Sequence, residues 1–194
     1  MENDRTKWNR KFSNRNGELN EPEPFVVRTA GLLRPGSVLD LASGDGRHAV
    51  YLAANGFSVT AVDIADAALE RLAQFAKERQ LAIEGRQMDL DHAEGLDDLG
   101  VFDNLLACHY KPPPELLDRF PALVRPGGMV ILCVFNLRQH QEHGFSLRYC
   151  AQDEEYLNAL PGFEVMQYEK MASNGAYLDG YLFCREQPIA TPHP

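Results

Sequence analysis

Residues 37–49, SVLDLASGDGRHA, encode a strand, a glycine turn and the start of a helix in direct succession. The apolar run that opens this segment is typical of a strand buried on both faces. Gly44 and Gly46 let the backbone of the turn approach a ligand closely, and a helix N-terminus presents free N–H groups. The segment therefore predicts the first unit of a nucleotide-binding α/β sheet.

Two classes of cofactor compete for this turn. Residues 44–49 satisfy G-x-G-x-x-G/A, the dinucleotide fingerprint. The turn is longer than a dinucleotide site needs, however, and Asp45 places negative charge where a pyrophosphate would lie. Asp40 is costly near the end of a buried strand unless something binds it, and an acid facing the turn suits a cofactor that carries positive charge. A tight turn without any ligand is the third interpretation.

The rest of the chain alternates between apolar strands and segments of helical periodicity. Further strands are predicted at residues 57–62, 81–88, 101–108 and 129–135, helices at 25–33, 66–76, 112–123 and 153–160, a turn at 125–128 and a long polar loop at 137–150. Two final strands, 163–169 and 176–185, flank Ser173-Asn174-Gly175, a strong hairpin signal. We expect an α/β fold whose doubly wound, mostly parallel sheet ends in an antiparallel hairpin.

The chain divides into a short N-terminal segment, one domain and a tail. Residues 1–24 are polar and contain Trp8 and Phe12 four positions apart, which predicts a short helix that docks onto the domain. Residues 25–186 are expected to form the single domain. Residues 187–194 contain three prolines and are predicted to be disordered.

Composition restricts the partners that this domain could bind. A net charge of −9 disfavours nucleic acid and anionic membranes. No apolar run approaches the ~20 residues that span a bilayer, and the first residues lack the apolar core of a secretory signal. The four cysteines form no C-x-x-C pair, and H-x-x-H at 140–143 is not H-E-x-x-H. We predict a cytoplasmic protein without a metal site that binds a small molecule; the pattern indicates no oligomeric state.

Acidic residues end three successive predicted strands. Asp40, Asp63 and Asp89 occupy these positions, and the fourth strand ends at His109-Tyr110. Because open α/β sheets bind ligands beyond the carboxyl ends of their strands, these side chains should converge on one site. Each acid taken alone could instead be a helix cap or a turn residue, and Asp66 competes with Asp63 as the cap of the next helix.

The run from Asp40 to Ala49 resembles motif I of the class I S-adenosylmethionine (SAM) methyltransferases, D/E-x-G-x-G-x-G. Ala42 stands where that pattern has its first glycine and is expected to keep a negative φ. WNRKF at 8–12, EPF at 23–25 and RPGG at 125–128 are similar to segments of the small tellurite-resistance-type methyltransferases and their thiopurine-like relatives. The resemblance implies a three-layer Rossmann-like fold with a seven-stranded sheet, whose N-terminal segment covers the cofactor pocket as a lid.

The resemblance also implies which residues bind SAM and its product S-adenosylhomocysteine. Asp40 would lie near the amino end of the cofactor, Asp63 on the ribose hydroxyls and Asp89 on the adenine amino group. The full implied set is Asp40, Ala42, Ser43, Gly44, Gly46, Asp63, Ile64, Met88, Asp89 and Leu90. An NAD(P)-dependent oxidoreductase and a catalytically idle SAM-binding module stay as alternatives.

The implied activity is methyl transfer to a small, anionic or soft (S/Se/Te) acceptor. A soft anion needs no catalytic side chain because a sulfonium methyl is already activated, so the enzyme mainly aligns the reactants. An oxygen or nitrogen acceptor needs a general base, and His109 is the candidate by position; a purely structural histidine is the alternative interpretation. Basic and aromatic side chains are expected around the acceptor; they are Trp8, Phe12, Tyr110, Arg138, His140, His143 and Arg148.

Overall fold

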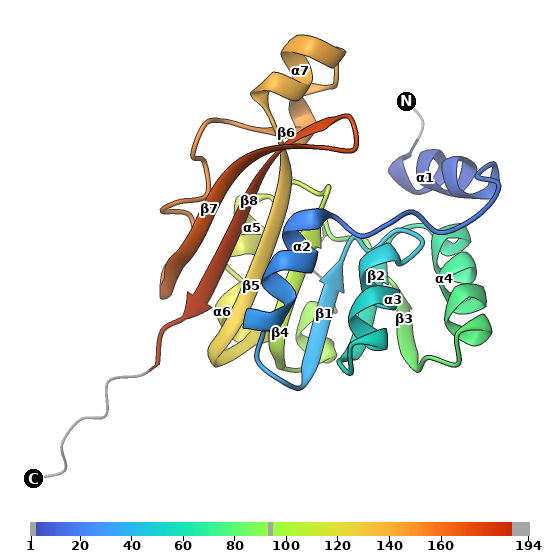
Figure 1. The fold of residues 1–194 in the computed structure, drawn as a ribbon, viewed down its shortest axis with the longest axis horizontal. Coiled ribbons are helices and arrows are strands. Elements are labelled where there is room, and N and C mark those ends of the chain that lie inside the picture. The colour runs from blue at the N-terminus through green and yellow to red at the C-terminus, as the bar shows by residue number, and fades with distance from the viewer. Residues whose placement is uncertain (1–2, 93–94, 188–194) are drawn as a thin grey trace, which may run out of the picture.

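The computed structural model describes residues 3–92 and 95–187. Figure 1 shows one twisted sheet with helices on both faces and α1 (Asp4–Ser13) beside α4 (Asp66–Glu78). The tail predicted to be disordered, 187–194, lies outside the described residues apart from Gln187. No helix within the described parts is long and apolar enough to cross a membrane.

The sheet follows the strand order β3-β2-β1-β4-β5-β8-β7. Its parallel strands are β1 (Ser37–Leu41), β2 (Ser58–Asp63), β3 (Ile83–Gln87), β4 (Phe102–Cys108) and β5 (Val124–Asn136). The hairpin of β7 (Phe163–Ser173) and β8 (Ala176–Arg185) joins β5 in antiparallel fashion. This confirms the predicted mostly parallel sheet with an antiparallel C-terminal hairpin. A two-residue strand, β6 (Cys150–Ala151), adds to β5 and was not predicted.

Alternation along the strands builds a core on each face of the sheet. Val38 of β1 packs with α2 (Pro24–Thr29), α3 (Arg47–Ala54) and α4, whereas Leu39 packs with α5 (Pro114–Leu117) and α6 (Phe120–Leu123). The short 3₁₀ turns η1 (Ala30–Leu32) and η2 (Leu96–Leu99) complete these two layers. Three layers result, and the carboxyl ends of the parallel strands stay open at one edge.

Several predicted elements differ from the structure. The polar segment 137–150 is not a loop: it forms α7 (Leu137–His143) and η3 (Leu147–Tyr149), because Asn136 accepts a capping bond from Arg138 N. The predicted helix 112–123 is divided into α5 and α6, and proline at the start of α6 has no N–H to continue α5. Residues 153–160 form turns instead of a helix, and Glu154 has a φ of +59°. The predicted turn 125–128 lies within β5 as a bulge.

Candidate active site

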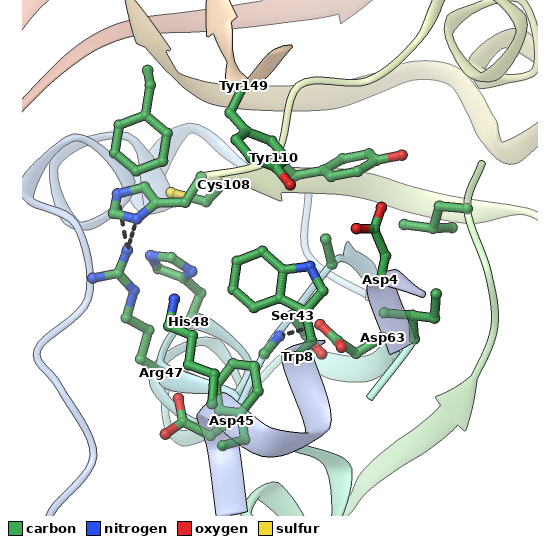
Figure 2. Close-up of a pocket in the computed structure, with 18 of the residues that line it drawn as sticks. Asp4, Trp8, Ser43, Asp45, Arg47, His48, Asp63, Cys108, Tyr110 and Tyr149 are labelled. Atoms are coloured by element: carbon green, nitrogen blue, oxygen red, sulfur yellow. Dashed lines mark hydrogen bonds between the residues drawn. The ribbon is translucent and has the colours of Figure 1, made fainter. Parts of the chain in front are cut away.

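The carboxyl ends of the parallel strands open into a cavity of about 640 Å³. Its wall is built by α1, by the turn between β1 and α3, by the ends of β2 and β4, and by segments that follow β3 and β5. In Figure 2, Trp8 of α1 lies between two groups of side chains. Ser43 and Asp63 are on one side of it, and Tyr110 and Tyr149 are on the other.

Asp63 is fixed by two backbone groups at the end of β2. Its Oδ2 accepts from Gly44 N at 2.7 Å and its Oδ1 accepts from Ala65 N at 2.8 Å, the first of which is drawn in Figure 2. Burial raises its pKa, and these two bonds oppose that shift. Asp66, the alternative cap, instead pairs with Arg5. A carboxylate oxygen can accept more than one hydrogen bond, so Asp63 keeps capacity for ligand hydroxyls.

Two buried polar atoms near the turn lack a partner among the described residues. They are Oδ2 of Asp40 and Oγ of Ser43. Burial, with the charge of Asp63 adding to it, raises the pKa of Asp40 to about 8. An unsatisfied buried polar group costs about 1–3 kcal/mol, so the turn fits a ligand with polar, partly cationic groups. Ser43 lines the cavity, whereas Asp40 lies behind the wall.

The turn is more strained than the sequence suggests. Ala42 has a φ of +53°, so the expectation that it keeps a negative φ is wrong. The left-handed conformation costs an L-residue about 1–2 kcal/mol, which indicates that this backbone shape is needed. Gly46 has a φ of +84°, a Cβ there would collide with the side chain of Leu72, and Gly46 does not line the cavity.

Asp45 does not carry the free negative charge that the sequence suggests. It is buried and pairs with Arg15 at 3.0 Å and with Arg71 at 3.3 Å. Two guanidinium groups compensate its charge, so repulsion of a pyrophosphate by Asp45 is not an argument against a dinucleotide. The choice of cofactor must come from other features.

Most of the residues implied for cofactor binding meet at this cavity. Ile64 and Met88 contribute partly exposed apolar surface and Leu90 a buried side chain, and Asp89 Oδ1 accepts from Asp91 N at 3.1 Å. The implied residues on the wall are Ala42, Ser43, Gly44, Asp63, Ile64, Met88, Asp89 and Leu90. An acid, an apolar slot and unsatisfied polar atoms therefore lie together, which fits a nucleoside with a polar extension.

His109 follows β4 on the opposite side of the cavity. It has a φ of +61°, and the centroid of its ring lies 4.6 Å from that of the Phe135 ring. Phe145 and Tyr149 continue this aromatic wall, and Tyr110, whose pKa is raised by burial, also lines it. Burial lowers the pKa of His109, so its neutral, basic form is favoured near neutral pH.

Glu23, which sequence reasoning did not assign, is fully buried beside His109. Its Oε1 lies 2.9 Å from His109 Nε2 and 3.2 Å from Arg47 Nη2, and its Oε2 accepts from Ser173 Oγ at 2.7 Å. Burial alone would raise its pKa, but the proximity of His109, the bond from Ser173 and the charge of Arg47 lower it. Its Oε1 forms no hydrogen bond with the described residues. Its sequence context, directly before a helix, contains no catalytic signal.

Helix α1 is fastened over the cavity from two sides. Arg5 pairs with Asp66 of α4, and Asn9 Oδ1 accepts from Ala67 N at 3.0 Å. On the other side, Lys7 Nζ lies 3.0 Å from Tyr149 Oη, and Arg148 pairs with Asp4. Trp8 and Phe12 are thereby held on the wall, as is Arg148.

Three residues expected beside the acceptor lie elsewhere. Arg138, His140 and His143 do not line the cavity. Arg138 pairs with Glu142, and His140 Nδ1 lies 2.6 Å from Phe145 O. The reason is that 137–143 form a helix beyond β6 (Figure 1) and not a loop over the site. Within residues 3–92 and 95–187, no group of three His, Cys, Asp or Glu could hold a metal ion.

Comparison with known proteins assigns the family. The family model for the methyltransferase domain matches residues 13–166. Putative methyltransferase YqeM of Bacillus subtilis is 28% identical over 134 residues, which are 65% of this chain and 53% of that protein. The chain spans about half the length of the first curated relatives that it matches.

Solved structures agree on the fold. TehB of Haemophilus influenzae has a TM-score of 0.68 at 16% identity, over 84% of this chain and 61% of TehB. Magnesium protoporphyrin IX methyltransferase of Synechocystis, solved with bound S-adenosylhomocysteine, has a TM-score of 0.66 at 18% identity, over 93% and 94% of the two chains. The family therefore assigns SAM as the cofactor. This chain belongs to the methyltransferase domain family.

Proposed function

We propose that this protein transfers a methyl group from SAM to a small, anionic or soft (S/Se/Te) acceptor that binds beside Lys11. The observation that carries the proposal is the charge balance of the wall. Arg15, Arg47 and Arg148 each face a carboxylate. Lys11 lines the same cavity and forms no ion pair with any residue that the structure describes.

The environment of Lys11 favours an anion. Lys11 is exposed to solvent, but the protein packed around it removes part of its solvation and lowers its pKa. The charges of Arg15 and Lys7 lower the pKa further, whereas Asp45 and Asp63 raise it. Its Nζ lies 4.3 Å from the ring centroid of Trp8, which holds it in the cavity. An anionic acceptor would offset both the lost solvation and the repulsion between like charges. Lys11 therefore takes the role that the sequence assigned to Arg138 and its neighbours.

The cofactor would occupy the other side of the cavity. Asp63 is proposed to accept hydrogen bonds from the ribose hydroxyls, and Asp89 one from the adenine amino group. Ile64 and Leu90 would pack on the adenine ring. Ser43 would bind the amino end of the cofactor, with Asp40 behind it. SAM supplies a methyl group on a sulfonium, and the protein's part is to align the acceptor with it and exclude water. Helix α1, which closes the cavity, supports a small acceptor.

Two observations support the proposed acceptor class, one for a soft acceptor and one for a small molecule. The likeness to TehB fits the tellurite-resistance-type branch that the sequence resembles. The net charge of −9 supports a small-molecule partner over nucleic acid or a membrane surface. A ubiquinone biosynthesis O-methyltransferase of Alkalilimnicola ehrlichii is also among the relatives, so hydroxyl acceptors belong in the same screen.

The test begins with calorimetric binding of S-adenosylhomocysteine and of NAD(H), followed by transfer of labelled methyl groups to tellurite, thiols and mercaptocarboxylates. For an anionic acceptor, Lys11→Met should raise KM roughly tenfold with little change in kcat, because one charge-assisted contact is lost. Lys170→Met is the matched control, since Lys170 is exposed and pairs with Asp153. Equal KM values in wild type and Lys11→Met would refute the anion site. Binding of NAD(H) alone would refute the activity.

A further inference from the structure

Glu23, His109 and Arg47 form a buried cluster on the acceptor side of the cavity. The side chain of Glu23 is fully buried, whereas that of His109 keeps 29% of its surface exposed. All three residues line the cavity, and His109 is the member whose side chain is most exposed to a ligand. This arrangement is that of a carboxylate behind a histidine, which orients the ring for proton transfer.

The distances favour one tautomer of His109. Glu23 Oε1 lies 2.9 Å from Nε2, although the two groups are not aligned as a hydrogen bond. A proton on Nε2 is the one that this carboxylate can stabilise, which leaves Nδ1 as the basic nitrogen. Arg47 Nη2 lies 3.1 Å from Nδ1 and 3.0 Å from Nε2. One donor cannot lie along both lone-pair directions, so Arg47 acts mainly as a positive charge beside the ring.

Charged and titratable groups from several elements face His109. Glu23 precedes α2, Arg47 and His48 belong to α3, and Lys11 belongs to α1. Burial is the largest influence and lowers the pKa of His109; Arg47 and Lys11 lower it too, whereas Glu23 raises it. Loss of the carboxylate charge would therefore leave a weaker base.

We propose that Glu23 positions His109 as the general base, and that the acceptor is a small molecule with an anionic group for Lys11 and a protonated thiol or hydroxyl for His109. The acceptor's electron pair forms a bond to the methyl carbon, while the carbon–sulfur bond breaks with its pair going to sulfur. The proton of the thiol or hydroxyl ends on Nδ1 of His109. This inference rests on the proposed function and narrows its acceptor class to hydroxy- and mercaptocarboxylates.

Two mercaptocarboxylates separate base catalysis from a structural role. The thiol of 3-mercaptopropionate is protonated at neutral pH, whereas that of 5-mercapto-2-nitrobenzoate is ionised and needs no base. His109→Asn and Glu23→Gln should lower kcat on the first about 10²- to 10⁴-fold and on the second only a few-fold. Glu23→Asp should restore part of the rate. Glu169→Gln, at an exposed ion pair with Arg28, is the matched control.

A second measurement does not depend on turnover. Nitrogen-15 spectra of His109 in the S-adenosylhomocysteine complex should show the proton on Nε2 in the wild type. In Glu23→Gln the ring should titrate at lower pH, because the carboxylate charge that holds its proton is gone. The acid limb of the kcat profile on 3-mercaptopropionate should move in the same direction.

Each outcome decides one level of the proposal. If the wild type does not bind S-adenosylhomocysteine, the proposed function fails. If it binds but methylates neither mercaptocarboxylate, the acceptor class is overturned. If folded, cofactor-binding variants lose equal rate on both acceptors, or if His109 titrates identically in wild type and Glu23→Gln, the positioning role of Glu23 is overturned.

Discussion

The two sides of the cavity are built in different ways. On the cofactor side the contacts are local: Asp63 bonds to Ala65, two positions on, and to Gly44, nineteen positions away. On the acceptor side the partners are far apart in the chain. Lys7 and Tyr149 are separated by 142 positions, and Glu23 and Ser173 by 150. The cofactor site follows from single strand–turn units, whereas the acceptor site exists only after the whole sheet has assembled.

This difference suggests where specificity resides. A turn held by its own backbone can stay the same while the segments that converge on the acceptor change. In this chain those segments are α1, the residue before α2, the end of β4 and the hairpin turn. Substitutions on the cofactor side should change affinity for every ligand of the SAM type, and substitutions on the other side should discriminate between acceptors.

The largest expected effect on the cofactor side is that of Asp63→Ala. The carboxylate would no longer accept hydrogen bonds from the ribose hydroxyls or from Gly44 N, so affinity for S-adenosylhomocysteine should fall by roughly 1–3 kcal/mol, or about 5- to 150-fold. Calorimetry measures this directly. Asp153→Ala, at an exposed ion pair, should bind as the wild type does. Unchanged affinity in Asp63→Ala would contradict the assignment of this half of the cavity to the cofactor.

Asp40→Asn should reveal a pH-dependent instability of the same turn. The pKa of Asp40 is raised to about 8 in the folded chain by burial, whereas the unfolded chain loses this proton near pH 4. Between these values the folded state binds more protons, so this group makes wild-type stability fall as pH rises from about 4 to 8. In urea unfolding, the advantage of Asp40→Asn should grow by at least about 1 kcal/mol from pH 5 to 8. Parallel curves would contradict the shift.

Tyr149→Phe tests the acceptor side, whose contacts join distant parts of the chain. It removes the bond between Tyr149 Oη and Lys7 Nζ, which fastens α1, and a hydrogen bond of this kind contributes about 0.5–1.5 kcal/mol. Amide exchange in α1 should accelerate severalfold, and S-adenosylhomocysteine should dissociate faster. Tyr51→Phe, whose site in α3 does not line the cavity, is the control. Equal exchange in both variants would show that the other contacts of α1, with α4 and with Arg148, hold it without this bond.

The same contrast explains what could be predicted from the sequence. Asp63 ends β2, Ile64 follows it, and Met88, Asp89 and Leu90 follow β3. Their convergence therefore needed only the rule that parallel strands end at one edge. Glu23 carries no such local signal, because its partners lie in three other elements. Arg138, His140 and His143 were misplaced because polar composition suggested a loop, whereas the cap at Asn136 starts a helix. Ala42 was misjudged because φ at a turn depends on the neighbours that fix it.

The smallest expected effect, that of Ala42→Gly, tests whether this strain is real. Ala42 has a φ of +53°, and glycine would remove the strain of about 1–2 kcal/mol that an L-residue has in this conformation. Glycine also makes the unfolded chain more flexible, which destabilises the folded state by about 0.4–1 kcal/mol. The variant should therefore be more stable by a few tenths of a kcal/mol to about 1 kcal/mol, as measured by urea unfolding. Ala73→Gly, in the interior of α4, should lose about 1 kcal/mol. If both substitutions destabilise equally, Ala42 is unstrained, and the turn is no more specialised for a ligand than an ordinary strand–helix connection.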